Sequence, residues 1–214
     1  MSAHVVIAAR GGPDAKSRFG GRLTEAQREA LVEAMLSDML EALGRCPAVD
    51  RIHLTTPTPA LARLAAARRA ELIVEAPGGL NAAFEAARRA VAAADPDGVV
   101  MLLPGDLPRL DGGDVAAVIE AAWEAVVLVP ATADGGTGAV AAPARVALPL
   151  AFGPGSFQKH LSAARALGVQ TRVIEAASLG FDMDRPEDIE ALLGSGDGRR
   201  AAALLRRFSA GEAA

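Results

Sequence analysis

Short apolar runs alternate with longer amphipathic segments along most of the chain. Each run is rich in aliphatic or β-branched residues and ends in glycine, proline or polar residues, which is typical of buried strands that lead into loops. The longer segments repeat apolar residues every three or four positions, which indicates helices packed on a sheet. The expected strands cover residues 4–9, 51–55, 71–74, 99–103, 126–129, 139–142 and 169–174, with a short edge strand around Phe181.

Local end signals place helices between these strands. Thr24 and Gln27 form a capping box before a helix of about five turns that ends near Gly44. Proline in the first turn opens two others, at Pro59 and Pro186. Further helices are expected over 80–94 and 113–123 and from residue 156 onward. This alternation predicts an α/β fold in three layers around a mostly parallel central sheet.

The chain has no internal repeat and no linker long enough to divide it, so we expect one domain over residues 1–214. Residues 194–198 are the one expected hinge, and the Ala- and Arg-rich segment of about 199–214 is predicted to be a terminal helix or tail on the surface. Asp38, inside the first long helix, is interpreted as a surface or loop-bonding residue rather than a catalyst.

Composition and charge exclude several classes of protein. The chain is 51% hydrophobic but only 3% aromatic, with no tyrosine and a net charge of −4, which argues against a nucleic-acid surface. No apolar run approaches the length of a membrane span. The single cysteine, Cys46, excludes a disulfide framework and is expected to be a small buried residue, which favours the cytoplasm.

Ligands of open parallel sheets bind beyond the carboxyl ends of the strands, so the loops that follow strands are candidate sites. The first such loop contains Arg10, Gly11 and Gly12, followed by Lys16 and Arg18. Glycines let the backbone approach an anion, and the two basic side chains add charge where a triphosphate would lie. The spacing is not that of a Walker A loop, and an ordinary solvent loop remains the alternative.

Carboxylates follow two later strands. Asp106 lies directly after the most apolar strand, where it could hold a Mg²⁺ that also binds substrate phosphates. Asp182 and Asp184 are two residues apart, so both would point to one side of an extended segment. The alternatives are helix caps: Asp106 for the next helix, although Asp111 is nearer to it, and Asp184 for the helix that begins at residue 186.

A third set of residues could bind a second phosphorylated ligand. Ser156, at the start of a helix with backbone N–H groups that we expect to be free, would form an anion site, with Lys159 or His160 facing it one turn later. The glycine-rich loop 134–138 offers another flexible backbone. The alternative for Ser156 is a plain helix cap. His4 and His53 lie inside predicted strands and are interpreted as structural residues.

The chain resembles the 2-phospho-L-lactate or phosphoenolpyruvate guanylyltransferases of coenzyme F-420 biosynthesis. The resemblance extends over nearly the whole chain, and it implies a nucleotide-diphospho-sugar-transferase-like fold, similar to that of molybdenum-cofactor guanylyltransferases. Its segments are, in family order, AKSRF, AMLSDML, LNAAFEAA, LLPGDLPRL, GGTGAV, FGPGSFQKHL and FDMDRPEDIEAL.

The resemblance implies that GMP passes from GTP to a small phosphorylated acid with release of pyrophosphate, and it assigns roles to residues. Lys16 and Asp106 would be catalytic. The other implied roles are nucleotide binding by Arg10, Gly11, Gly12, Lys16 and Asn81, acceptor binding by Thr137, Gly138, Gly155 and Ser156, and Mg²⁺ binding by Asp106, Asp182 and Asp184.

Two departures from the family pattern leave the identity of the acceptor and of the nucleotide base undetermined. Gly138 stands where the family usually has a second threonine, and the loop at 10–12 is not the common lysine-rich form. The acceptor is therefore expected to be 2-phospholactate, phosphoenolpyruvate or 3-phosphoglycerate. Alternatives are a related cofactor nucleotidyltransferase with another acceptor or CTP, and a nucleotide-binding module without turnover. A homodimer is also compatible with the sequence.

Overall fold

A computed structural model describes residues 1–73, 78–196 and 199–211. Within these residues the strands are β1 (Ala3–Ala8), β2 (Arg51–Thr55), β3 (Glu71–Ile73), β4 (Val99–Pro104), β5 (Val126–Pro130), β6 (Thr137–Pro143) and β7 (Thr171–Val173). The helices are α1 (Glu25–Gly44), α2 (Pro59–Ala66), α3 (Leu80–Ala94), α4 (Gly112–Ala122), α5 (Ser156–Ala166), α6 (Ala177–Gly180), α7 (Pro186–Ser195) and α8 (Arg200–Ser209), with one turn of 3-10 helix, η1 (Ser17–Phe19).

The described strands form one seven-stranded sheet in the order β3-β2-β1-β4-β6-β5-β7. β1 lies between β2 and β4 and is parallel to both. β6 runs antiparallel to its neighbours β4 and β5, whereas β7 is parallel to β5. The predicted mostly parallel sheet is thus confirmed. The strand order reverses between β1 and β4, which is where open α/β sheets bind ligands.

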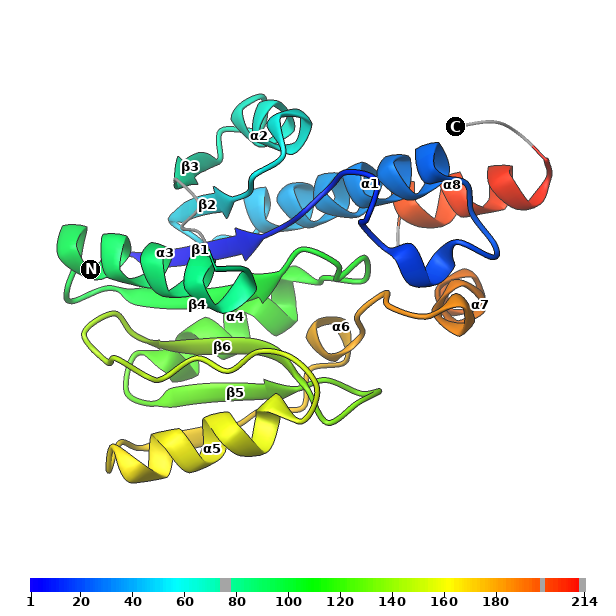
Figure 1. Cartoon of the computed structure of the whole chain (residues 1–214). Coiled ribbons are helices and arrows are strands. Elements are labelled where there is room, and N and C mark those ends of the chain that lie inside the picture. The colour runs from blue at the N-terminus through cyan, green and yellow to red at the C-terminus, as the bar shows by residue number, and fades with distance from the viewer. Residues whose placement is uncertain (74–77, 197–198, 212–214) are drawn as a thin grey trace.

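The sheet is covered on both faces because successive residues of a buried strand point to opposite sides. In β1, Val5 and Ile7 belong to the core on one face, and Val6 and Ala8 belong to the core on the other. The first core is closed mainly by α1, α4, α7 and α8, and the second by α3 and α5 (Figure 1). The three predicted layers are therefore confirmed.

The ends of two helices follow the local signals. Thr24 Oγ1 accepts from Gln27 N at 3.3 Å while Gln27 Oε1 accepts from Thr24 N at 3.0 Å, which completes the predicted capping box of α1. The carboxylate of Asp111 accepts from Gly113 N at 2.8 Å before α4. Asp111, and not Asp106, therefore caps α4.

The last third of the chain departs from expectation in two places. Phe181 is not in a strand; it follows the short helix α6, whose four residues are too few for helical periodicity to be visible in the sequence. The expected hinge 194–198 begins inside α7, which continues to Ser195. Residues 197 and 198, like Val74 of the expected third strand, lie outside the described residues.

The Ala- and Arg-rich segment after α7 forms the predicted helix, α8. Its side chains Ala201 and Leu205 are buried beside α1. Asp38 of α1 is only 3% exposed, and its carboxylate accepts from the backbone N–H groups of Arg200 and Ala201 at 2.8 and 2.9 Å. An acceptor at the first amides stabilises a helix start. The surface alternative for Asp38 is therefore wrong, whereas its bonds to backbone amides agree with the loop-bonding alternative, and the side chain anchors α8.

The remaining whole-chain expectations concern Cys46 and membrane spans. Cys46 is buried, and its Sγ lies 3.3 Å from Gly112 O, in agreement with a packing role. The described helices include none with the length and apolar character that a membrane span needs.

Candidate active site

Three adjoining cavities follow the carboxyl edge of the sheet. The β2-side cavity, of about 290 Å³, lies between the ends of β1 and β2 and the start of α3. The central cavity, of about 370 Å³, lies over the ends of β1 and β4. The β6-side cavity, of about 200 Å³, lies between β4, β6 and the turn before α5. Leu80 lines all three, so they form one trough across the switch point.

Lys16 lies in the middle of this trough. Its backbone is left-handed, with φ 53° and ψ 36°, which is uncommon for a residue other than glycine. The side chain is 10% exposed, and Nζ donates to Asp106 Oδ2 at 2.7 Å and to Asp184 Oδ1 at 3.4 Å. Burial lowers the pKa of the amine, but the two carboxylates outweigh burial and raise the pKa. The buried ammonium form is therefore stable.

Asp106 is held at the end of β4 by a close approach to β1. Gly105 N donates to Ala8 O at 2.9 Å, and a Cβ on Gly105 would lie 2.9 Å from that same oxygen, so no larger residue fits. Asp106 O accepts from Met183 N at 3.0 Å, which fixes the next acidic segment alongside. Asp106 Oδ1 is buried and has no hydrogen-bond partner among the described residues. A buried oxygen without a hydrogen-bond partner lowers the stability of the protein, so its presence marks a position suited to a ligand.

Asp182 and Asp184 reach the trough from one side of an extended segment. Met183 between them is fully buried, so the two flanking carboxylates point the other way, as their spacing predicts. Burial raises the pKa of Asp182 to about 6, and repulsion by Asp106, Asp184 and Asp134 adds to the rise. This concentration of negative charge favours binding of a cation.

Asp184 lines the trough and is not a helix cap. Its carboxylate pairs with Lys16 and Arg18. The carboxylate that accepts from the amides before α7 belongs to Asp188, at 2.8 Å from Asp184 N and 2.6 Å from Arg185 N. Asp188 therefore stabilises the start of α7 by hydrogen bonds, which leaves the Asp184 side chain to the trough.

The chemistry of these three carboxylates fits a Mg²⁺ ion. Mg²⁺ takes oxygen ligands and keeps several waters, so two or three carboxylates around one cavity are sufficient. The orphan Oδ1 of Asp106 and the mutual repulsion at Asp182 are both relieved by a cation. Within the described residues, no group of three or more His, Cys, Asp or Glu side chains is already arranged around a metal position. The Lys16 ammonium supplies the counter-charge instead.

The glycine loop after β1 contributes one side chain to the trough. Arg10 lines the β2-side and central cavities. Gly11 N donates to Thr58 Oγ1 at 2.9 Å, and Gly12, with φ 96°, accepts from Ala15 N through its oxygen at 2.9 Å. Neither glycine is among the residues that line the three cavities. Their binding to nucleotide stays a prediction, and the amide of Gly11 is already used.

Asn81 connects α3 to the turn before α5. Its Nδ2 donates to Phe152 O at 3.1 Å, and its Oδ1 accepts from Phe152 N at 2.7 Å. Both ends of the amide are therefore used by backbone 71 residues away. Direct contact with the nucleotide stays a prediction, and the contact seen is a structural one.

The acceptor residues expected from the sequence divide into two pairs. Thr137 and Gly138, at the start of β6, line the β6-side cavity together with the turn 152–154, which begins the segment FGPGSFQKHL that the sequence singled out. Gly155 precedes α5 in the left-handed conformation, and Ser156 is fully buried. Neither is among the residues that line this cavity.

The first amides of α5 already have partners. Ser156 N donates to Gly153 O at 3.0 Å, and Phe157 N donates to Gly135 O at 3.2 Å. The expectation of free N–H groups at this helix start is wrong for these two residues. Ser156 Oγ donates to Thr137 Oγ1 at 3.0 Å, so Ser156 contacts the cavity wall through Thr137.

Gly138 is explained by packing. A Cβ at this position would lie 1.9 Å from Leu179 O, because β6 and α6 approach each other closely. A threonine could not occupy this backbone position without a shift of one element. The hydroxyl on the wall of the β6-side cavity comes from the preceding residue, Thr137.

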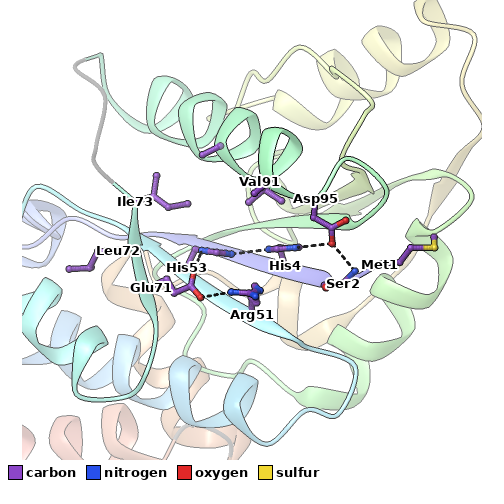
Figure 2. Close-up of a pocket in the computed structure, with 12 residues that line it drawn as sticks. Met1, Ser2, His4, Arg51, His53, Glu71, Leu72, Ile73, Val91 and Asp95 are labelled. Atoms are coloured by element: carbon purple, nitrogen blue, oxygen red, sulfur yellow. Dashed lines mark hydrogen bonds and ion pairs between the residues drawn. The ribbon is translucent and has the colours of Figure 1, made fainter.

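A further cavity, of about 500 Å³, lies at the opposite edge of the sheet, where β1, β2 and β3 begin (Figure 2). His4 and His53 are buried in its wall, with Nδ1 and Nε2 3.0 Å apart. His4 Nε2 lies 3.4 Å from Asp95, and His53 Nδ1 lies 3.5 Å from Glu71. Both histidines thus have protein partners, as expected of structural residues.

The sheet order is that of a nucleotide-diphospho-sugar-transferase-like fold. A solved structure from Desulfovibrio desulfuricans G20, described as a nucleotide-diphospho-sugar transferase, matches with a TM-score of 0.82 over 98% of this chain and 96% of that chain. The sequence identity is 18%, so this likeness establishes the fold alone. The predicted fold class is confirmed.

The family model "Guanylyl transferase CofC like" matches residues 3–211. A 3-phospho-D-glycerate guanylyltransferase from Phenylobacterium zucineum (strain HLK1) is 45% identical over 207 residues, 95% of each chain. A phosphoenolpyruvate guanylyltransferase from Rubrobacter xylanophilus is 39% identical over 198 residues, 92% of this chain and 96% of the relative. The chain therefore belongs to the CofC-like guanylyl transferase family, and the resemblance inferred from the motifs is confirmed.

Proposed function

We propose that this protein transfers GMP from GTP to the phosphate of a small three-carbon acid and releases pyrophosphate. The observation that carries the proposal is the trough, in which Asp106 and Asp184 line both the central and the β6-side cavities, whereas the β2-side cavity has Arg10 as its single charged lining residue. The guanine and ribose would occupy the β2-side cavity, the triphosphate the central cavity, and the acceptor the β6-side cavity. This order brings the acceptor's phosphate next to the α-phosphate.

The reaction is an in-line displacement. An oxygen of the acceptor's phosphate attacks the α-phosphorus of GTP and forms a new P–O bond. The bond from the α-phosphorus to the oxygen that bridges to the β-phosphate breaks, and its electron pair leaves on pyrophosphate. Lys16 would turn from Asp106 toward the phosphates and neutralise charge there, with Arg10 and Arg18 nearby. Catalysis of this kind rests on positioning and electrostatic stabilisation.

The carboxylates of Asp106, Asp182 and Asp184 would hold Mg²⁺. When bound, the ion would draw charge away from the phosphates and help to orient them. The chain's own part is to present three partly buried carboxylates on a fixed frame, with Met183 N hydrogen-bonded to Asp106 O. Because Lys16 now pairs with the same carboxylates, cation and nucleotide binding would release the lysine for the substrate.

For the acceptor, we favour 3-phospho-D-glycerate, because the relative named 3-phospho-D-glycerate guanylyltransferase is 45% identical over 95% of both chains. Phosphoenolpyruvate and 2-phospho-L-lactate carry the same two anionic groups, a carboxylate and a phosphate, and are the alternatives. The product would serve coenzyme F-420 biosynthesis, and we propose that the reaction takes place in the cytoplasm.

The test is pyrophosphate release by the purified protein with Mg²⁺, each of the four nucleoside triphosphates and each of the three acids. The expected result is release with GTP and 3-phospho-D-glycerate. Release only with CTP, or only with another acid, would identify a different nucleotidyltransferase. Binding of nucleotide without release in any combination would identify a non-catalytic module.

The metal assignment is tested by Asp106→Asn. Loss of this charge removes a ligand and the strongest partner of Lys16, so we expect turnover to fall at least about a hundredfold. Asp97→Asn, on an exposed loop away from the trough, is the control and should keep full activity. Circular dichroism checks that both variants fold. Full Mg²⁺-dependent activity of Asp106→Asn would contradict the assignment.

A further inference from the structure

His160 of α5 is fully buried behind the β6-side cavity and contacts two parts of its wall. Its Nδ1 lies 2.9 Å from Thr137 Oγ1, at the start of β6. Its Nε2 lies 2.9 Å from Ala151 N, in the segment that leads to the turn 152–154. The ring also packs edge-on against Phe152, with centroids 5.0 Å apart. One side chain thus connects β6 to the turn that faces it.

The backbone amide of Ala151 sets the direction of these hydrogen bonds. A backbone N–H can only donate, so Nε2 of His160 accepts and the ring proton lies on Nδ1. Nδ1 then donates to Thr137 Oγ1, which also accepts from Ser156 Oγ. Both lone pairs of the Thr137 hydroxyl are then used. Its own proton is left to donate to a further acceptor.

The histidine keeps this arrangement at ordinary pH. Burial lowers the pKa of His160 to about 4, and the positive charge of Lys159 lowers it further. The neutral ring therefore persists across the working range of most enzymes. A protonated ring would set Nε2–H against the Ala151 N–H, two donors facing each other.

We infer that His160 is a positioning residue that directs the Thr137 hydroxyl proton for binding of the acceptor's phosphate. This inference rests on the proposed function. An anionic phosphate oxygen is the acceptor that the oriented hydroxyl lacks, and Thr137 lines the cavity proposed for it. Among the described residues, the hydrogen-bond and ring partners of His160 include none of the carboxylates that contact Lys16. Its role therefore concerns the acceptor and not the nucleotide.

Two substitutions test separately the His160 bond to Thr137 and the His160 bond to Ala151. In His160→Asn, the amide nitrogen can take the place of Nδ1 and keep donating to Thr137. In His160→Gln, the longer amide can take the place of Nε2 and keep only the bond from Ala151. His53→Gln, at a buried histidine near the opposite edge of the sheet, is the matched control. Steady-state kinetics then give the KM of the acceptor and of GTP for each variant.

We expect His160→Gln to raise the acceptor KM about tenfold or more, the effect of losing one oriented hydrogen bond. His160→Asn should stay within about threefold of the wild type, and the GTP KM of both should change by less than about twofold. Equal acceptor KM values for the two variants, or a parallel rise of the GTP KM, would show that His160 is only structural. If His160→Gln does not fold, Thr137→Val and Thr137→Ser give the same contrast, because only serine keeps the hydroxyl.

A binding measurement separates this inference from the proposed function. Calorimetric titration of 3-phospho-D-glycerate, with Mg²⁺ and a non-hydrolysable GTP analogue present, reads acceptor affinity without turnover. A wild type that binds the acid but releases no pyrophosphate would refute the proposed function. Intact turnover, with the same acceptor affinity in His160→Gln as in His160→Asn, would refute the role of His160 alone.

Discussion

Replacement of Asp182 by Asn should stabilise the protein while it disables the site. The Asp182 carboxyl is partly buried among three other carboxylates, and its pKa is raised from a usual value near 3.8 to about 6. An ionised group with a raised pKa destabilises the native state at neutral pH. Asparagine has nearly the same shape without the charge, so it removes the penalty. It also removes one of the proposed ligands of Mg²⁺.

The size and pH dependence follow from the same pKa. The full shift corresponds to roughly 3 kcal/mol, and solvent screening of this partly exposed group reduces the expected gain to about 1–2 kcal/mol. Because the native state keeps its proton up to about pH 6, the penalty appears as pH rises from 3.8 to about 6. The gain from Asp182→Asn should thus be complete at pH 7.5 and largely absent at pH 4.

Urea unfolding followed by circular dichroism, in EDTA at both pH values, measures this gain. Asp97→Asn, which removes an exposed carboxylate, should change the free energy of unfolding by less than about 0.5 kcal/mol. The reasoning fails if Asp182→Asn is less stable than the wild type at pH 7.5, or if its gain is the same at pH 4. Pyrophosphate release should meanwhile fall at least about a hundredfold.

Two further substitutions test the packing of the trough by urea unfolding. Gly138→Ala should lower the free energy of unfolding by about 2 kcal/mol or more, because its Cβ would lie 1.9 Å from Leu179 O. The control is Gly194→Ala, in a helix with open space around it, which should be neutral or stabilising. Equal losses of stability in the two variants would refute the steric argument. Thr55→Val should raise stability by about 1 kcal/mol, because the buried Thr55 Oγ1 has no hydrogen-bond partner among the described residues. A loss of stability in Thr55→Val would point to a partner for that hydroxyl.

The fold was predictable where local signals are strong. β2 begins and ends at the predicted residues, and the predicted helix over 80–94 coincides with α3, because periodicity and end signals agree there. α6 was missed because four residues show no periodicity, and the true role of Asp38 depends on a helix 162 residues further along the chain. Long-range partners of this kind leave no trace in a local pattern.

The same distinction holds for the candidate site. The sequence placed Lys16, Asp106 and Asp184 by their positions after strands, and the structure brings these three side chains together. The contacts of Asn81 and His160 could not be anticipated, because their partners come from distant turns whose path the sequence does not reveal. Position along a strand is a local property, whereas the direction of a buried hydrogen bond is not.

The reversed direction of β6 has a consequence for the family. Because β6 runs against its neighbours, its first residue, not its last, meets the carboxyl edge of the sheet. One uninterrupted stretch, residues 126–166, thereby supplies both the loop before β6 and the turn before α5, which both line the β6-side cavity. If this cavity binds the acceptor, as proposed, this one stretch of chain would set the acceptor preference. Exchange of residues 126–166 between relatives would then change that preference and leave the residues around Lys16 as they were.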